Sequence, residues 1–575
     1  MKRKLLSLVL TCSLILAACG SGTGEKAPTA GNPSGTSETA KEGADTETEE
    51  KASSDAAENS ESPEDSESAK APDSKWLNPG KGESVQDIVG RIKEGDGEKG
   101  EDENVNENET SSGSGVLDVV NSPVSELEYV GDMYIEYRYP ALTLGYYSIA
   151  DGEMVTDSAH AGLAKSLDSY NKKVKALCEE EKKSLAEMAE DAQADGASFA
   201  QFTLTYDAYV TRADMKAMSF YEQSYEFAGG AHGSSAWTTH NYDSETGSEL
   251  GFKDVFTDVD SLPALFADGF RSAYSDMTFD SNIEDRIRQS IETGDEQILF
   301  SLSYGCVHIF AQDYFLTSHT GGQKITLSYS DYPDLVKKEW QTEPDEWILP
   351  LNYYSDYMID NKRVSMDWEY TGVDDVDWNF SVNGNKHNEK FFAYQPNCYL
   401  VKAKGLSLLY LRIPVGDVSM ISNVYEITNT DLKLIEQIDY APYSKFSLNP
   451  NRMLLSLNEY VDQSPSMLLP YGEYHVDYDG LPVINEEVYG LEGNDVILKE
   501  AARVNPPDPE DAAVSGGMWN LAKGTRLTPL RTDRKTYVDY ITEMDQVCRF
   551  GIDKFAYDMQ LDNFGTPEDI FERAD

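Results

Sequence analysis

The sequence predicts an α+β domain, built as an antiparallel sheet with packed helices, followed by an all-β region and a small terminal β-barrel-like module. Three observations predict this order. Aromatic residues alternate with polar ones from Phe220 to Phe227, a period-2 pattern typical of a strand. Apolar residues recur at helical spacing after His160, which indicates a long amphipathic helix. Beyond Pro344, short aromatic-rich segments alternate with Asn, Gly and Pro turns.

The N-terminal residues predict a lipoprotein signal peptide over residues 1–18. A basic start is followed by an apolar run, Leu5 to Leu16, that is too short to span a bilayer. Leu16-Ala-Ala-Cys19 then resembles a lipobox, in which the thiol of Cys19 accepts a diacylglyceryl group. The alternative is an ordinary secretory signal in which Cys19 is incidental. The lipoprotein interpretation places the chain on the outer face of the cytoplasmic membrane, which it contacts only through its lipid anchor.

Residues 19–115 are predicted to form a lipidated, disordered acidic stalk. They consist almost entirely of small and polar residues, which bury too little apolar surface to offset the entropy of ordering. The formal net charge of the whole chain is -54. Such a charge repels nucleic acid and anionic lipid headgroups and attracts cationic proteins, although it would also simply keep a secreted protein soluble. We therefore expect no nucleic-acid partner.

Residues 116–343 carry the pattern of the α+β domain. Leu163, Leu167, Tyr170 and Val174 follow a 4-3-4 spacing, which predicts a helix with one apolar face. A second helix is expected to begin at Ser261, because a proline follows in its first turn. The other expected elements are a helix over Asn282–Ile291 and strands over Tyr134–Leu144, 199–212, 219–227, Phe300–Phe315 and 324–330.

The remainder is predicted to be all-β. Residues 344–504 contain short strands at a spacing that favours a sandwich, since no clean repeat period supports a propeller. Residues 505–575 begin with a proline-rich linker and are predicted to form a small SH3-like module. The expected strands are 377–382, 390–394, 399–401, 406–413, 423–427, 524–533 and 536–540, followed by a helical turn at 566–571.

The stretch from Tyr225 to Phe256 is predicted to be a β-meander around which the α+β domain is organised. Gly229, Gly230 and Gly233 crowd a turn that also holds His232, which predicts an exposed Gly-His-Gly loop. Residues 237–242 are expected to form the returning strand, and the sequence Asp-Ser-Glu-Thr-Gly that follows is expected to form a second turn.

Gly229-Gly-Ala-His-Gly233, together with the segments 241–247 and 250–256, resembles the extracytoplasmic domain of the lysozyme-binding anti-sigma factors of Gram-positive bacteria. The same module precedes some peptidoglycan deacetylases. The resemblance covers roughly residues 125–340, and Tyr314 to Gly322 lies at a second family segment. It implies docking of lysozyme, or of another cationic wall-active protein, through the two loops. This sequence has Ser318-His319 where the family has Pro-Tyr. The binding residues implied are Gly229, Gly230, His232, Gly233, Tyr314, His319 and Gly322.

The sequence favours a binding protein over an enzyme. His232 lies near Ser234 and Ser235, yet no nucleophile elbow or order of triad residues is present. The histidines and cysteines lack metal-ligand spacing, so we predict no catalytic residue, no metal and no cofactor. Cys178, Cys306, Cys398 and Cys548 are expected to be mostly buried thiols. A glycan-binding lipoprotein is the alternative function, because the chain holds 35 Tyr and 7 Trp. A wall-associated hydrolase is the second alternative.

Overall fold

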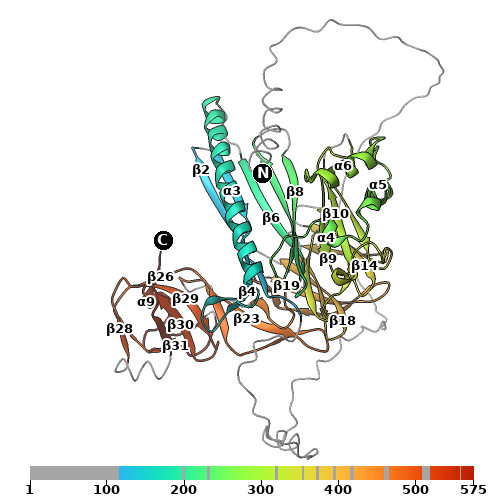
Figure 1. Ribbon diagram of the computed structural model, residues 1–575. Coiled ribbons are helices and arrows are strands. Elements are labelled where there is room, and N and C mark those ends of the chain that lie inside the picture. The colour runs from blue at the N-terminus through green and yellow to red at the C-terminus, as the bar shows by residue number, and fades with distance from the viewer. Residues whose placement is uncertain are drawn as a thin grey trace, which may run out of the picture. The chain divides into compact units, whose positions relative to one another are not determined.

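A computed structural model describes the chain from residue 115 to residue 574 (Figure 1). The description leaves out residues 132, 197–200, 230–232, 318–320, 353–354, 371–374, 393–396, 415–419, 444, 459–464, 508–517 and 557. The chain divides into two compact units, residues 1–104 and 105–575, and every described residue belongs to the second. The predicted signal peptide, Cys19 and almost all of the predicted stalk therefore lie outside the described residues.

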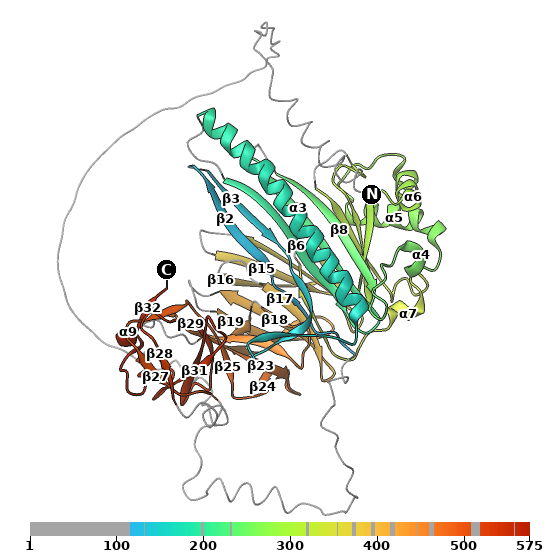
Figure 2. The same cartoon turned by 60° about the vertical axis from the view of Figure 1, so that its left-hand side comes forward.

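A five-stranded sheet with one long helix across it forms the first part of the described chain (Figure 2). The strand order is β2-β3-β6-β7-β8, in which β3 and β6 are parallel and the other pairs antiparallel. Helix α3 makes the crossover between the two parallel strands. The bounds are β2 (Val124–Val130), β3 (Met133–Tyr139), α3 (Ala161–Ala194), β6 (Gln201–Ala213), β7 (Ala217–Phe227) and β8 (Ser234–Asp243).

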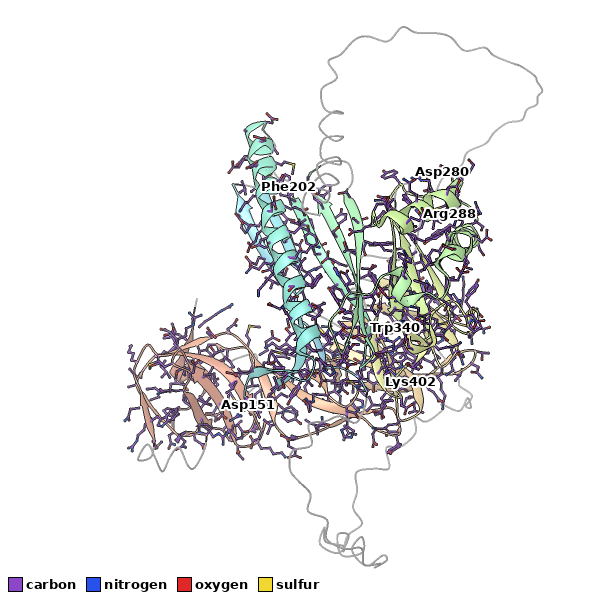
Figure 3. All side chains as sticks on the ribbon, in the orientation of Figure 1. Asp151, Phe202, Asp280, Arg288, Trp340 and Lys402 are labelled. Atoms are coloured by element: carbon purple, nitrogen blue, oxygen red, sulfur yellow. The ribbon has the colours of Figure 1, made fainter. Side chains whose placement is uncertain are left out.

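The helix predicted after His160 is confirmed as α3. Its buried positions include Leu163, Leu167, Tyr170 and Val174, the residues whose spacing predicted it. They pack against the sheet in one core, where Phe202, labelled in Figure 3, lies beside the helix. None of the described helices is both long and apolar enough to cross a membrane.

Two segments predicted as single strands are each two strands, so those predictions were wrong. The segment Tyr134–Leu144 is interrupted at Pro140, which has no N–H to donate to a strand ladder, and it continues as β4. The segment Phe300–Phe315 reverses at Gly305, whose φ of 66° suits a tight turn. The bounds are β1 (Val119–Asn121), β4 (Leu142–Ser148) and β5 (Glu153–Thr156) in one sheet, and β9 (Ile298–Ser303), β10 (Cys306–Ala311) and β11 (Gln323–Ser328) in another.

The sheet of β9, β10 and β11 has its own helices and its own core. The helices predicted from Ser261 and over Asn282–Ile291 are confirmed as α5 and α6, and Phe266, Phe270 and Ile287 bury their apolar sides against this sheet. The bounds are α4 (Phe252–Val255), the 3-10 helix η1 (Val259–Ser261), α5 (Leu262–Ala273), α6 (Ile283–Thr293) and α7 (Lys338–Gln341).

Residues 347–438 contribute two sheets that pack face to face. Trp347, Leu409 and Tyr425 of one sheet share a core with Tyr357 and Trp378 of the other. The first sheet contains β12 (Trp347–Leu351), β17 (Asn397–Ala403), β18 (Leu406–Pro414), β19 (Met420–Ile427) and β20 (Leu432–Ile438). The second contains β13 (Ser355–Ile359), β14 (Lys362–Tyr370), β15 (Asp375–Val382) and β16 (Asn385–Phe392).

The C-terminal strands belong to a ten-stranded sheet that spans the boundary predicted after residue 504. The sheet contains β21 (Tyr440–Pro442), β22 (Met453–Leu457), β23 (Leu469–Val476), β24 (Pro482–Ile484), β25 (Tyr489–Glu492), β26 (Val496–Leu498), β29 (Arg526–Thr532), β30 (Tyr537–Thr542), β31 (Val547–Gly551) and β32 (Phe571–Arg573). A separate pair joins β27 (Ala502–Val504) to β28 (Trp519–Leu521), so hydrogen bonds cross the predicted boundary itself. The helical turn predicted near Thr566 is α9 (Pro567–Ile570).

The predicted α+β domain shares its core with the strands that follow it. Val401, Leu408 and Tyr410, from β17 and β18, lie in the same apolar cluster as Leu163 and Phe202. Segments on both sides of residue 343 are thus buried together, and experiments on this part of the molecule call for the whole chain. The four cysteines Cys178, Cys306, Cys398 and Cys548 are all buried and free.

Candidate functional site

The five-stranded sheet presents two different faces, because side chains alternate along each strand. Phe220 and Glu222 of β7 point to the side covered by α3, where Tyr170 of the helix contacts both of them. Tyr221 and Tyr225 point to the other side. We call the first side the helix face and the second the open face.

The helix face buries polar groups as well as apolar ones. Glu222 accepts a hydrogen bond of 2.7 Å from the hydroxyl of Tyr170, and burial raises the pKa of its carboxyl group although this bond opposes the shift. His240 of β8 lies against the rings of Tyr170 and Phe220, and burial lowers its pKa to about 3. These groups have partners in the packed core, and their arrangement is that of a structural network.

One end of the open face is covered by the sheet of β9, β10 and β11. Tyr221 stacks on Tyr209 at 5.1 Å between ring centroids and contacts Phe310 at 4.9 Å. Asn241 donates a hydrogen bond of 2.8 Å to the carbonyl of Phe300. This end of the face is therefore a packed interface within the molecule.

The other end of the open face, toward the loop between β7 and β8, carries partly exposed aromatic rings. Tyr225 is 40% exposed and Tyr129 is 70% exposed, whereas Glu222 on the helix face is only 7% exposed. The set that we call the aromatic set consists of Tyr129, Tyr134, Tyr225, Phe227 and Trp237.

Polar side chains lie between these rings on the same face. Gln201 donates to Glu136 at 3.2 Å, and Arg138 makes a two-point ion pair with Asp207 at 2.8 and 2.7 Å. Gln223 lies directly across from Trp237 on the neighbouring strand. Aromatic faces and amide or charged groups thus alternate over a broad surface.

Gly233, one of the predicted site residues, provides the space for the Tyr225 ring. A Cβ atom added to this glycine would lie 2.5 Å from the ring, closer than any real contact of that kind. Any larger residue would therefore displace the ring. Gly229, at the other end of the same loop, lies beside the ring of Phe202.

Trp237 connects the first predicted loop to the second. The side-chain amide of Gln312 bonds to both backbone groups of Trp237. The Gln312 oxygen accepts from the Trp237 N–H at 3.1 Å, and the Gln312 NH₂ group donates to the Trp237 carbonyl at 2.6 Å. Gly322 lies against the ring of Trp237, where an added Cβ would be 3.3 Å away. Gly233 and Gly322, which are far apart in the sequence, thus each lie against an aromatic ring of the open face, one on β7 and the other on the adjacent strand β8.

Tyr314 lies in the second loop and is 52% exposed. Its φ of 57° is in the left-handed region, which is uncommon for a residue with a large side chain. The loop is closed by hydrogen bonds from the Phe315 N–H to the Gln312 carbonyl at 3.1 Å and from the Gly321 N–H to the carboxylate of Asp313. These bonds present the Tyr314 ring at the surface.

Three of the predicted site residues, Gly230, His232 and His319, lie outside the described residues, as Cys19 does. Among the residues that are described, no group of three or more His, Cys, Asp or Glu side chains could hold a metal ion. The arrangement on the open face is suited to recognition through ring contacts and hydrogen bonds.

A family model described as Deacetylase PdaC matches residues 135–235. The matched segment runs from β3 through α3, β6 and β7 into the start of β8, and it contains Tyr225 and Gly233. The resemblance predicted for this module is thus confirmed in its coarser form: the chain contains a PdaC-like segment, which indicates an extracytoplasmic binding module. The word deacetylase describes the family for which the model is named.

Two solved structures are also similar to part of the chain. A DUF3298 family protein from Pseudomonas aeruginosa PAO1 is 15% identical, with a TM-score of 0.24, and the match covers 40% of this chain and 97% of that one. A DUF3298 family member from Bacteroides fragilis NCTC 9343 is 16% identical, with a TM-score of 0.27, and the match covers 39% and 96%. TM-scores this low support no conclusion about function. Among curated proteins, none matches.

The sequence analysis missed Tyr225, Trp237 and Gln312 as site residues. The alternation along β7 was a usable signal for Tyr225, since it groups this residue with Tyr221 and Phe227 on one face. No local signal marks Gln312, because its contact with Trp237 joins residues 75 positions apart.

Proposed function

We propose that this protein is a non-enzymatic binding or sensing protein of the cell envelope, which recognises a cationic wall-active protein such as lysozyme through the open face. The observation that carries the proposal is the aromatic set, with Gly233 and Gly322 seating the rings of Tyr225 and Trp237. The PdaC-like match of residues 135–235 supports an extracytoplasmic binding role.

The exposed tyrosine rings and the net charge of the chain favour a protein ligand. Exposed tyrosine rings such as those of Tyr129 and Tyr225, in a polar surround, are typical of the residues that carry most of the energy in protein interfaces. The net charge of -54 would speed the encounter with a cationic partner. The predicted lipid anchor at Cys19 would hold this surface outside the membrane and in reach of wall-active proteins.

A cell-wall glycan is the second candidate ligand, and one observation favours it. The aromatic rings alternate with Gln201, Gln223 and Glu136 on one face. Sugars are commonly bound by rings that stack on their apolar sides and by amide or carboxylate groups that bond to their hydroxyls. A wall-associated hydrolase is a further alternative.

The test is calorimetric titration of the full chain with lysozyme and, separately, with soluble peptidoglycan fragments. The variant Tyr225→Ala/Trp237→Ala removes two central rings of the aromatic set. We expect it to weaken lysozyme binding by at least about tenfold, or about 1.4 kcal/mol. Tyr314→Ala should weaken binding less, since that ring belongs to a separate loop after β10 and is not part of the aromatic set.

The matched control is Tyr478→Ala, which removes a tyrosine that is 80% exposed and lies outside the five-stranded sheet. It should leave the affinity unchanged. If a cationic protein is the ligand, the association rate should fall steeply with salt, whereas glycan binding should persist. No lysozyme binding at micromolar concentration and low salt, together with glycan binding that the double variant abolishes, would establish the second candidate.

A further inference from the structure

A pocket of about 150 Å³ lies between β18, β19 and the strands that begin the ten-stranded sheet, far along the chain from the open face. Its walls are mostly apolar, and Arg412 is the one arginine in its lining. Representative lining residues are Arg412, Met420, Pro442, Leu457, Asn458 and Glu492.

Arg412 differs from the partly buried arginines that are paired with a carboxylate. Arg138 is paired with Asp207 at 2.7 Å, and Arg549 is paired with Asp539 at 2.7 Å. Arg412 has no carboxylate within ion-pair distance among the described residues, and its Nε atom is buried without a hydrogen-bond partner. Its guanidinium group donates to the sulfur of Met420, a weak acceptor.

The guanidinium group of Arg412 thus has an N–H donor that no described protein group accepts. This is unusual in a chain with 102 acidic and 48 basic residues, in which most arginines can find a carboxylate partner. Burial of a guanidinium group costs free energy unless donors and charge are matched. Burial also lowers the pKa of Arg412, in line with its missing counter-charge. A carboxylate that entered the pocket would satisfy the guanidinium donors with charge-assisted hydrogen bonds.

The rest of the lining restricts the kind of anion. Leu457, Met420 and Pro442 offer apolar contact to an aliphatic group, while the side-chain amide of Asn458 can donate a hydrogen bond. Glu492 also lines the pocket, and its negative charge disfavours a doubly charged anion such as phosphate. The pocket is smaller than the usual site for a drug-sized ligand, so it fits one short acid or one terminal residue.

The neighbouring pocket is a poorer place for an aliphatic acid. It has a volume of about 240 Å³, shares Leu457 and Asn458 with the first pocket, and is otherwise lined by the polar groups of Asp439, Tyr440 and Arg534. The guanidinium group of Arg534 lies 5.0 Å from the centre of the Tyr489 ring. Lys445 is close enough to Glu492 for their charges to interact, and its ammonium group lies 4.0 Å from the centre of the Tyr147 ring. The apolar residues Met420, Pro442 and Leu469 line only the first pocket of the two, so the carboxylate of an aliphatic acid is placed at Arg412.

We propose that this pocket binds the carboxylate of a small aliphatic ligand, either a short free acid or the C-terminal residue of a peptide, through the guanidinium group of Arg412. The site is made by other strands than the open face, and it does not depend on the function proposed for that face.

The proposal is tested by calorimetric titration of the full chain with propionate, N-acetyl-Ala-Ala, the C-terminal amide of that dipeptide, and inorganic phosphate. We expect saturable binding of the dipeptide or of propionate, and no binding of the amide or phosphate, at concentrations up to about 10 mM. Equal affinity for propionate and the dipeptide would identify a free acid as the source. Tighter binding of the dipeptide would identify a peptide terminus.

Arg412→Gln should weaken the binding of the carboxylate by at least about tenfold. Arg503→Gln is the matched control, because Arg503 is exposed on β27, and it should bind as the unchanged protein does. Near-ultraviolet circular dichroism reports whether each variant is folded. If Arg412→Gln does not fold, the comparison of dipeptide and amide on the unchanged protein still decides. Equal binding of acid and amide, unchanged binding by a folded Arg412→Gln, or no binding of either carboxylate would overturn the proposal.

Discussion

The two faces of the five-stranded sheet are built from the same strands but differ in which residues they bury. On β7, the helix face takes Phe220 and Glu222, which are 0% and 7% exposed. The open face takes Tyr225, which is 40% exposed. The carboxylate of Glu222 is thus buried, while the ring of Tyr225, three positions along the same strand, is in contact with solvent. The difference shows that the burial of a side chain on β7 depends on which element packs against its face of the sheet. The polarity of the side chain does not predict its burial here.

The two faces should also differ in what a substitution changes, the stability of the fold or the affinity for a ligand. Side chains on the helix face contact many neighbours, so changes there should act on folding. Tyr129 and Tyr225 of the aromatic set are 70% and 40% exposed, so changes there should act mainly on the ligand, whereas Trp237 also packs against Phe310 at 4.9 Å between ring centroids. Three predictions follow from this contrast, in order of decreasing expected effect.

The largest expected effect is the loss of stability on replacing Phe220. This ring packs on Tyr170 and His240 at 4.8 Å, and Phe220→Ala should lower the free energy of unfolding by about 3 to 5 kcal/mol. Tyr225→Ala on the same strand should lower it by less than about 1 kcal/mol, because the ring is partly exposed. Urea unfolding of the full chain followed by circular dichroism measures both. Equal losses in the two variants would contradict the distinction between the faces.

An intermediate effect is expected from the buried imidazole of His240. Its pKa of about 3 lies below the ordinary value of 6.5, so its stabilising contribution is complete above pH 6.5 and is lost as the pH falls toward 3. At pH 5 the loss should be about 2 kcal/mol. His240→Phe keeps a ring in contact with Phe220 and removes the titration, so its unfolding free energy should fall less between pH 7 and pH 5.

Other titrating groups beside His240 bear on the design of this measurement. Burial raises the pKa of Glu222, so its contribution to stability grows as the pH falls toward its unfolded value near 4.5. Lys173 adds to the lowering of the His240 pKa. Both groups are present in the unchanged protein and in the variant, so the difference between their pH profiles reports His240. Parallel profiles would show that this histidine does not titrate in the window.

The smallest expected change in stability comes from Gly233→Ala. The added methyl group would meet the Tyr225 ring at 2.5 Å and displace it, while the backbone of this residue needs no left-handed conformation. We expect a loss of stability below about 1 kcal/mol and a several-fold loss of affinity for the ligand of the open face. Gly251→Ala is the control, since the nearest atom to its added Cβ is 3.6 Å away. Retained affinity in Gly233→Ala would remove Tyr225 from the site.

Much of the local structure could be predicted from the sequence because its causes are local. The spacing of Leu163, Leu167 and Tyr170 specifies a helix with one apolar face, and α3 has these residues buried. The proline in the first turn of α5 and the alternation along β7 have similarly short-range causes. The single strands expected over Tyr134–Leu144 and Phe300–Phe315 were wrong because Pro140 and Gly305 break them, and both residues are visible in the sequence.

By itself, the sequence determined the helix α3, the strands around the Gly229–Gly233 loop, and two glycine-containing loops as the place to look for a ligand. Only the tertiary structure decided that Gly233 lies against the Tyr225 ring and Gly322 against the Trp237 ring, and that Gln312 bonds to the backbone of Trp237. It also decided that Arg412 lines a pocket without a carboxylate partner among the described residues. The physical reason is the separation in sequence of the residues that interact. Secondary-structure propensity and hydrophobic periodicity depend on residues a few positions apart, whereas the covering of a sheet face and the pairing of a charge depend on contacts between segments far apart in the chain.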